Sequence, residues 1–336
     1  DSFNTAVGHN AGLSVTTGIF NTLTGGLAGD ALTTGTRNVA IGKDALTSDT
    51  LGSRSTAVGF AALFSQNFTT ATDAYNVGVG EQAGLNVTTG IQNTLIGGLA
   101  GDALTDADIN VAVGYGALSS DTMGSKSVAV GKNALFSQNF TTATDTLNTG
   151  VGHNAGAQIT TGVNNTFIGG LSGDAVTTGT ESVALGSNSL SANTEGTANT
   201  ALGAYALRND TLGSRSVAVG HQALNAQNFT TATSAYNVAV GANAGVSVTT
   251  GDLNTLIGGL SGDALTEGNQ NVGLGYRALT GDTKGRKNVA VGVESLYTQN
   301  FTTLTESFNT AVGFRAGFAI TTGIRNTLVG AIAGDA

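Results

Sequence analysis

The 336-residue sequence contains no cysteine, no proline and no tryptophan, and only 10% of its residues are charged. Without cysteine, the chain has no disulfide bonds and no thiolate chemistry. Proline would remove a hydrogen bond from a sheet ladder, so its absence fits strands that pair on both sides. No apolar run approaches the ~18–20 residues of a membrane span. We therefore predict no membrane insertion within this segment.

The charge balance is acidic, because 22 Asp and Glu residues outnumber 13 Lys and Arg residues and give a formal net charge of −9. The basic residues form no stripe or cluster, so nucleic acid is not a predicted partner. The chain does not begin with methionine, and both of its ends fall inside a repeating pattern. We expect it to be processed or to be a segment of a longer protein.

A five-residue frame, N-[T/V]-x-[V/I/L]-G, occurs nineteen times along the chain, with Asn or Ser at its first position. Fourteen of the eighteen intervals are short, as from Asn4 to Asn21, and four are longer by four positions, as from Ser55 to Asn76. A fixed short period indicates one structural unit stacked on copies of itself. The first positions are Asn4, Asn21, Asn38, Ser55, Asn76, Asn93, Asn110, Ser127, Asn148, Asn165, Ser182, Asn199, Ser216, Asn237, Asn254, Asn271, Asn288, Asn309 and Asn326.

The second position of the frame is always Thr or Val, and the fourth is aliphatic in every row but that of Thr24. These two positions share one face of a strand. Because they are β-branched or aliphatic, we predict that this face covers the interior of a coil. The third position points to the opposite face and is mostly Ala or Gly. A small, apolar second face is unlike a solvated one, and we expect another chain to cover it.

The fifth position is Gly in every row, and we predict a backbone conformation there that a residue with a Cβ would resist. Examples of these structural glycines are Gly8, Gly25, Gly42, Gly59, Gly80 and Gly97. A second short strand is expected to follow, for instance over residues 13–16, before a polar turn. Two strands and two turns in each row predict one coil of an all-β, parallel β-solenoid or β-roll. About 19 coils spaced at ~4.8 Å would give a rod of roughly 85 Å.

The rows group into super-repeats of three short rows followed by one long row, within a single predicted domain over residues 1–336. The super-repeats cover residues 4–75, 76–147, 148–236, 237–308 and, in part, 309–336, and the third contains one additional short row. Each long row carries a similar loop that must bulge from the coil. This loop is either a packed structural element or a contact loop. The four loops centre on Phe68, Phe140, Phe229 and Phe301.

Residue types that carry chemistry are present but dispersed. His9, His153 and His221 each follow the repeat Gly in rows far apart, so we predict solvent-facing turn residues. The Asp of the recurring Gly-Asp-Ala occurs once per super-repeat and is predicted to form turn hydrogen bonds. No Ser-His-Asp arrangement stands out. We therefore predict no catalytic residues, no metal site and no cofactor.

The frames NTAVG and NVAVG, followed three residues later by Ala, resemble the head repeats of trimeric autotransporter adhesins, the YadA-like family. They are also similar to repeats in bacteriophage tail fibres. The resemblance covers Asn4 to Ala333. It implies a left-handed parallel β-roll in which three chains surround one axis, and an extracellular location on a cell surface, an outer membrane or a virion. Rows of that family are usually shorter than even the short rows here, and this chain contains no coiled-coil stalk.

In such a homotrimer, the large residues at the third position of the frame would lie near the threefold axis. These residues are Leu23, Leu95, Phe167, Leu256 and Leu328. The resemblance also implies binding to host cells or matrix through the surface of the head.

Several functions remain open on the sequence alone. The favoured one is a non-enzymatic, homotrimeric structural and adhesive fibre that contacts a host cell, matrix or neighbouring filaments. A bacteriophage tail fibre or a cell-surface filament subunit would use the same architecture. The abundant Thr also allows a monomeric ice- or ligand-binding solenoid. A polysaccharide-cleaving enzyme would need clustered carboxylates at a defined separation, and the recurrent ones here sit in repeat turns.

Overall fold

The computed structural model describes residues 3–335, and within them the chain is an all-β parallel solenoid without helices. Each coil contains one three-residue strand at positions two to four of the frame, and nineteen such strands occur. This confirms the predicted fold class and the one-coil-per-row assignment. The chain divides into two compact units, one that ends at Asn165 and one that begins at Thr166.

In the first unit these strands are β1 (Thr5–Val7), β2 (Thr22–Thr24), β3 (Val39–Ile41), β5 (Thr56–Val58), β7 (Val77–Val79), β8 (Thr94–Ile96), β9 (Val111–Val113), β11 (Val128–Val130) and β13 (Thr149–Val151). In the second unit they are β14 (Thr166–Ile168), β15 (Val183–Leu185), β16 (Thr200–Leu202), β18 (Val217–Val219), β20 (Val238–Val240), β21 (Thr255–Ile257), β22 (Val272–Leu274), β24 (Val289–Val291), β26 (Thr310–Val312) and β27 (Thr327–Val329).

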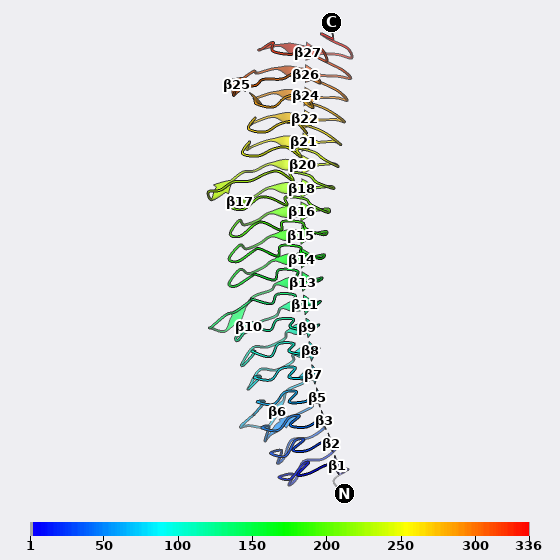
Figure 1. Cartoon of the computed structure of the whole chain (residues 1–336), viewed down its shortest axis with the longest axis vertical. Coiled ribbons are helices and arrows are strands. Elements are labelled where there is room, and N and C mark those ends of the chain that lie inside the picture. The colour runs from blue at the N-terminus through cyan, green and yellow to red at the C-terminus, as the bar shows by residue number, and fades with distance from the viewer. Residues whose placement is uncertain (1–2, 336) are drawn as a thin grey trace. The chain divides into compact units, whose positions relative to one another are not determined.

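Within each unit, every strand pairs in parallel and in register with the strand of the next coil. In the first unit Leu23 lies opposite Ala40, and Ala40 lies opposite Ala57. Equivalent frame positions therefore form straight columns along the stack. Figure 1 shows the strands of successive coils lying side by side in this way within each unit.

Each long row adds a two-stranded parallel ladder with the row before it. The four ladders are β4 (Gly52–Ser53) with β6 (Thr72–Asp73), β10 (Gly124–Ser125) with β12 (Thr144–Asp145), β17 (Gly213–Ser214) with β19 (Thr233–Ser234), and β23 (Gly285–Arg286) with β25 (Thr305–Glu306). In Figure 1, β10 and β17 project from the side of their coils away from the central strands. The predicted bulge of the long row is thus an ordered ladder and loop.

The predicted second strand over residues 13–16 is wrong, because that segment is a series of turns. Local turn hydrogen bonds form there instead of a ladder, since the Leu13 N–H donates to the Asn10 carbonyl at 3.2 Å and the Val15 N–H to the Gly12 carbonyl at 3.1 Å. The turns still bond to the next coil, since the Gly12 N–H donates to the Ala28 carbonyl at 3.0 Å. One strand per coil is therefore enough to connect the stack.

The predicted orientation of the strand faces is also wrong. The third position, expected to meet another chain, lies inside the coil, whereas positions two and four point outward and are partly exposed. Of the residues predicted at a trimer axis, four are buried within a single chain and the fifth is partly buried against the last core cluster of the second unit. The four are Leu23, Leu95, Phe167 and Leu256, and the fifth is Leu328.

The reason is the narrow interior of the coil. A Cβ added to Gly29 would lie 2.8 Å from a methyl group of Leu23, so the side chain at the third position already reaches the opposite wall. The wall therefore carries Gly in the row with the large side chain and also in the row before it, as at Gly12, where an added Cβ would lie 2.7 Å from Leu23. The other rows carry Leu there, such as Leu46 and Leu63. Phe167 likewise lies against Gly173, where an added Cβ would be 2.5 Å from the ring. Close packing of this kind leaves no room for two β-branched rows inside.

The Gly at the fifth position has the predicted special backbone. At Gly25 φ is +139°, and an added Cβ would lie 2.3 Å from the carbonyl oxygen of Gly42 in the next coil. The same φ region recurs at the fifth position of every coil. A residue with a Cβ would therefore suffer both backbone strain and a clash with the neighbouring coil.

We predict that Gly25→Ala lowers the free energy of unfolding by about 1–3 kcal/mol from backbone strain alone. The adjacent Gly26 is a matched control, because nothing lies within 4 Å of a Cβ added there. Gly26→Ala should stay within about 0.5 kcal/mol of the parent chain. Urea unfolding of both variants checks this, and equal midpoints for the two would contradict it.

Candidate functional site

The first position of the frame forms a buried ladder of amide side chains. Asn38 shows the pattern: its Oδ1 accepts the Ser55 N–H at 2.9 Å, and its Nδ2 donates to the Gly52 carbonyl at 2.9 Å. Its own N–H donates to Oδ1 of Asn21 in the previous coil. Such an Asn joins two coils and closes its own coil across the interior, whereas Asn288 donates its Nδ2 to Asn271 Oδ1 of the previous coil instead. The sequence pattern revealed this column, but not its role.

A second column in the interior carries the super-repeat. Eleven residues after the first position, successive rows of each super-repeat hold two aliphatic residues, then Asp, then Gln. In the first super-repeat these are Val15, Leu32, Asp49 and Gln66. The Asp–Gln pair recurs as Asp121–Gln138, Asp210–Gln227 and Asp282–Gln299, and all eight side chains are buried. The additional row of the third super-repeat holds Asn193 at this place.

The Asp–Gln pair is bonded in one orientation. Gln66 Nε2 donates to Asp49 Oδ2 at 2.6 Å and to Ser55 Oγ at 2.9 Å. Gln66 Oε1 accepts a hydrogen bond from Asn76 Nδ2 at 2.9 Å. Gln66 thus occupies the gap that arises where Ser55 replaces Asn in the first column. Asp49 Oδ1 accepts the backbone N–H groups of Gly52 and Phe68.

This carboxylate anchors the loop of the long row. Besides the Phe68 N–H bonded to Asp49, the Thr50 hydroxyl donates to the Phe68 carbonyl at 3.0 Å. The Phe68 side chain is only 5% exposed, and Phe140, Phe229 and Phe301 are similarly buried. The four aromatic rings therefore hold their loops down. The loop tip, such as Thr69 and Thr70, is exposed, as are Asn67 and Asp73 beside it. A contact role for the loops stays a prediction.

Burial raises the pKa of Asp49, Asp210 and Asp282, and their hydrogen bonds offset this only in part. The opposite holds for Asp106 on the surface, whose pKa is lowered mainly by hydrogen bonds from the Thr89 and Thr88 hydroxyls. The buried carboxylates are thus costly to ionise, while the surface carboxylate is readily charged.

The loop of the first long row and the next two coils line an open groove of about 440 Å³. The groove is lined by Phe68, Thr69, Thr70, Thr72, Thr89, Ile91, Asp106 and Asp108. This volume is within the usual range of small-ligand pockets, roughly 300–1,000 Å³. A second hollow of about 210 Å³ lies beside Glu81, Gly98 and Tyr115 on the same unit.

The outer face of the main strands is, in each unit, an uninterrupted column of Thr, Val, Ile and Leu, and no charged residue occurs at positions two or four. Ile41, Ile96 and Ile168 at position four are 36–40% exposed. Contiguous apolar surface of more than a few hundred Å² marks an interaction site. Nothing within the described chain covers this face, as the exposure of these side chains indicates.

Charged groups beside the loops are mostly paired within the chain. Arg54 bonds Asp73 at 2.9 Å and lies over the Tyr75 ring. Equivalent pairs occur between Lys126 and Asp145 and between Lys287 and Glu306. His9, His153 and His221 are exposed, as predicted. Among residues 3–335 no three His, Cys, Asp or Glu residues gather as metal ligands, and no helix has the length and apolarity of a membrane span.

Comparison of the sequence with protein-family models and with curated proteins gives no match. The resemblance to YadA-like head repeats therefore stays a prediction that rests on the repeated frame.

The raised pKa values set the sign of the pH dependence of stability. Between the unfolded pKa, near 3.8, and the higher folded pKa, the folded chain binds more protons than the unfolded chain. Its free energy of unfolding therefore falls as the pH rises through that interval. We predict that stability increases as the pH is lowered from neutrality toward 3.8, and that replacing Asp49, Asp210 and Asp282 by Asn together reduces this slope.

Asp106→Asn is the control, because a carboxyl with a lowered pKa changes the stability only below about 3.8. Urea midpoints measured at several pH values for the three proteins test the prediction. An unchanged slope in the triple variant would show that the buried carboxyls are not the source.

Proposed function

We propose that the protein is a non-enzymatic extracellular fibre, structural and adhesive, whose chains assemble as a homotrimer through the outer face of the main strands. The observation that carries this proposal is the long Thr/Val/Ile/Leu face without any charge. Three copies related by a cyclic axis bury such a face on every chain and leave none unpaired. The resemblance to trimeric adhesin heads supports the number three.

The choice of face differs from the expectation based on the third position of the frame. The side chains at that position are buried in the chain's own core, so they cannot contact a partner chain. Positions two and four, by contrast, carry β-branched side chains that remain partly exposed. Their regular spacing suits interdigitation with an identical face, as in sheets packed about 10 Å apart.

The adhesive part of the proposal rests on the four loops of the long rows. Each loop is held by a buried Phe and a buried Asp, as Phe68 and Asp49 illustrate, while its threonine tip is exposed. Binding residues are often found on loops that a rigid scaffold positions. A tail fibre or a filament subunit would use the same surfaces, and its location would then be a virion or a cell-surface filament.

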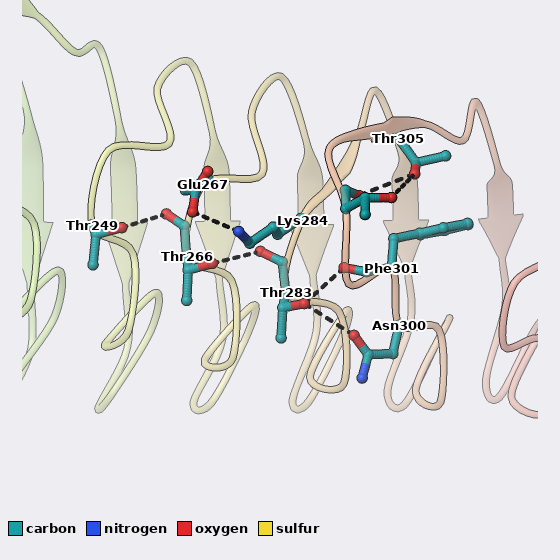
Figure 2. A network of polar contacts seen from close by, with 9 residues as sticks. Thr249, Thr266, Glu267, Thr283, Lys284, Asn300, Phe301 and Thr305 are labelled. Atoms are coloured by element: carbon teal, nitrogen blue, oxygen red, sulfur yellow. Dashed lines mark hydrogen bonds and ion pairs between the residues drawn. The ribbon is translucent and has the colours of Figure 1, made fainter.

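The hydroxyls of the threonine column in the turns argue against an ice-binding face there. In the second unit the Thr249 hydroxyl donates to the Thr266 carbonyl at 3.2 Å, and Thr266 donates to Thr283 in the same way. Figure 2 shows this chain of hydrogen bonds, which ends where Thr283 contacts the Phe301 carbonyl and the Asn300 side chain. These hydroxyls connect coils and are not free to order water.

We predict that the purified chain has a solution mass near three times 33.2 kDa by light scattering. Replacing Ile257 and Leu274 on the outer face by Lys should yield a folded monomer, because like charges would be buried at the axis. Phe60→Lys is the control, since Phe60 is exposed but lies outside the strand. A parent chain that is monomeric would refute the trimer.

A further inference from the structure

The groove under the loop of the first long row has the chemistry of a cation site. Asp106 and Asp108 come from one coil, and the buried Ala107 lies between them. Asp106 Oδ1 accepts the hydroxyls of Thr88 and Thr89 at 2.7 and 2.6 Å. These bonds hold the carboxylate in place and lower its pKa, so it is charged near neutral pH.

No cation of the chain occupies this groove. Among residues 3–335, the ion pairs of the structure involve neither Asp106 nor Asp108. Phe68 and Ile91 supply an apolar wall, which suits the methylene stem of a long basic side chain. The groove therefore offers charge, hydrogen-bond acceptors and an apolar support together.

In the second unit, the acidic residue at the equivalent position is paired with a basic residue of the chain itself. Glu267 occupies the position equivalent to Asp106. Each lies in the second row after a loop with the sequence NFTTAT. The next row there supplies Lys284, whose ammonium lies 2.7 Å from the Glu267 carboxylate (Figure 2). In the first unit the place of Lys284 is taken by Met123, which cannot neutralise Asp106. One unit thus carries its own cation, and the other lacks it.

We propose that the groove of the first unit binds a lysine or arginine side chain of a partner polypeptide. The ammonium or guanidinium group occupies the place that Lys284 takes beside Glu267, and the side chain's stem lies against Phe68 and Ile91. The loop tip, Thr69 to Thr72, covers it from one side. This inference rests on the adhesive part of the proposed function, for which it supplies the chemistry of the partner.

The probe is an acetylated, amidated pentapeptide with one arginine between glycines and serines, and its neutral analogue contains citrulline instead. Ligand-observed NMR titrations at low ionic strength measure binding to the full chain. We expect the arginine peptide to bind at one site per chain and the citrulline peptide to bind at least about tenfold more weakly. Equal binding of both peptides would overturn the proposal.

Three variants locate the site. Asp106→Asn removes the charge, and Met123→Lys supplies an internal cation, so each should weaken binding about tenfold or more. Glu195→Gln is the charge-matched control. Glu195 is exposed and lies in the same column, but in the third row after the preceding loop, not the second. The control variant should bind like the parent chain.

The titrations of the variants test the proposal directly. Parent-like binding by Asp106→Asn, or by Met123→Lys, would refute the groove as a receptor for basic side chains. Circular dichroism of each variant confirms folding before the titration. Oligomeric state is measured separately by light scattering, so failure of the groove and failure of the trimer are distinguishable.

Discussion

The buried amide column is the interaction on which the rest of the structure depends. A coil with a single three-residue strand has too few sheet hydrogen bonds to define its cross-section. The side chain of Asn38 supplies the missing constraint, because it bonds the next coil and also closes its own coil through the Gly52 carbonyl. Buried polar groups are costly when unpaired, so a column in which every amide is satisfied specifies both the size of the coil and the register of the stack.

Three of the four Asp–Gln pairs lie beside a Ser in the amide column, and the fourth, Asp282–Gln299, lies beside Asn288. Where Ser55 interrupts the amide column, Gln66 reaches in and restores the contact to Asn76, and Asp49 then fixes Gln66 in one orientation. The same Asp accepts the N–H at the start of the loop of the long row. A buried carboxylate is therefore retained, despite the burial that raises its pKa, because it couples the interior to the only part of the row that differs in length. The buried Asp–Gln pair and the surface loop therefore recur together, once in each of the four complete super-repeats.

The sequence was sufficient to predict the solenoid, its period and the special backbone at Gly25, because a strict period and an invariant Gly report on the backbone directly. It was not sufficient to orient the strand. Position two and position four looked buried because they are β-branched, but that preference reflects strand geometry as well as burial. The decisive signal was a complementarity in side-chain size within each coil. The large Leu23 lies opposite Gly29, and the small Ala40 is matched by Leu46, which shows that the third position faces the opposite wall. Asp106 was not singled out either, because a groove built from three coils has no motif.

The inverted faces change the argument for assembly. An apolar third position could have been explained by a partner chain, but the interior of the coil accounts for it completely. The aliphatic fourth position has no such explanation within the chain, because Ile96 and Ile257 remain more than a third exposed while every neighbour in the column is also without charge. A sheet that faced water on this side would carry charged as well as polar residues in alternation with the core, whereas Thr is the only polar residue in these columns. The absence of any charge from these columns is therefore the strongest physical reason to expect a partner, and identical chains are the partner whose columns match in spacing at every coil.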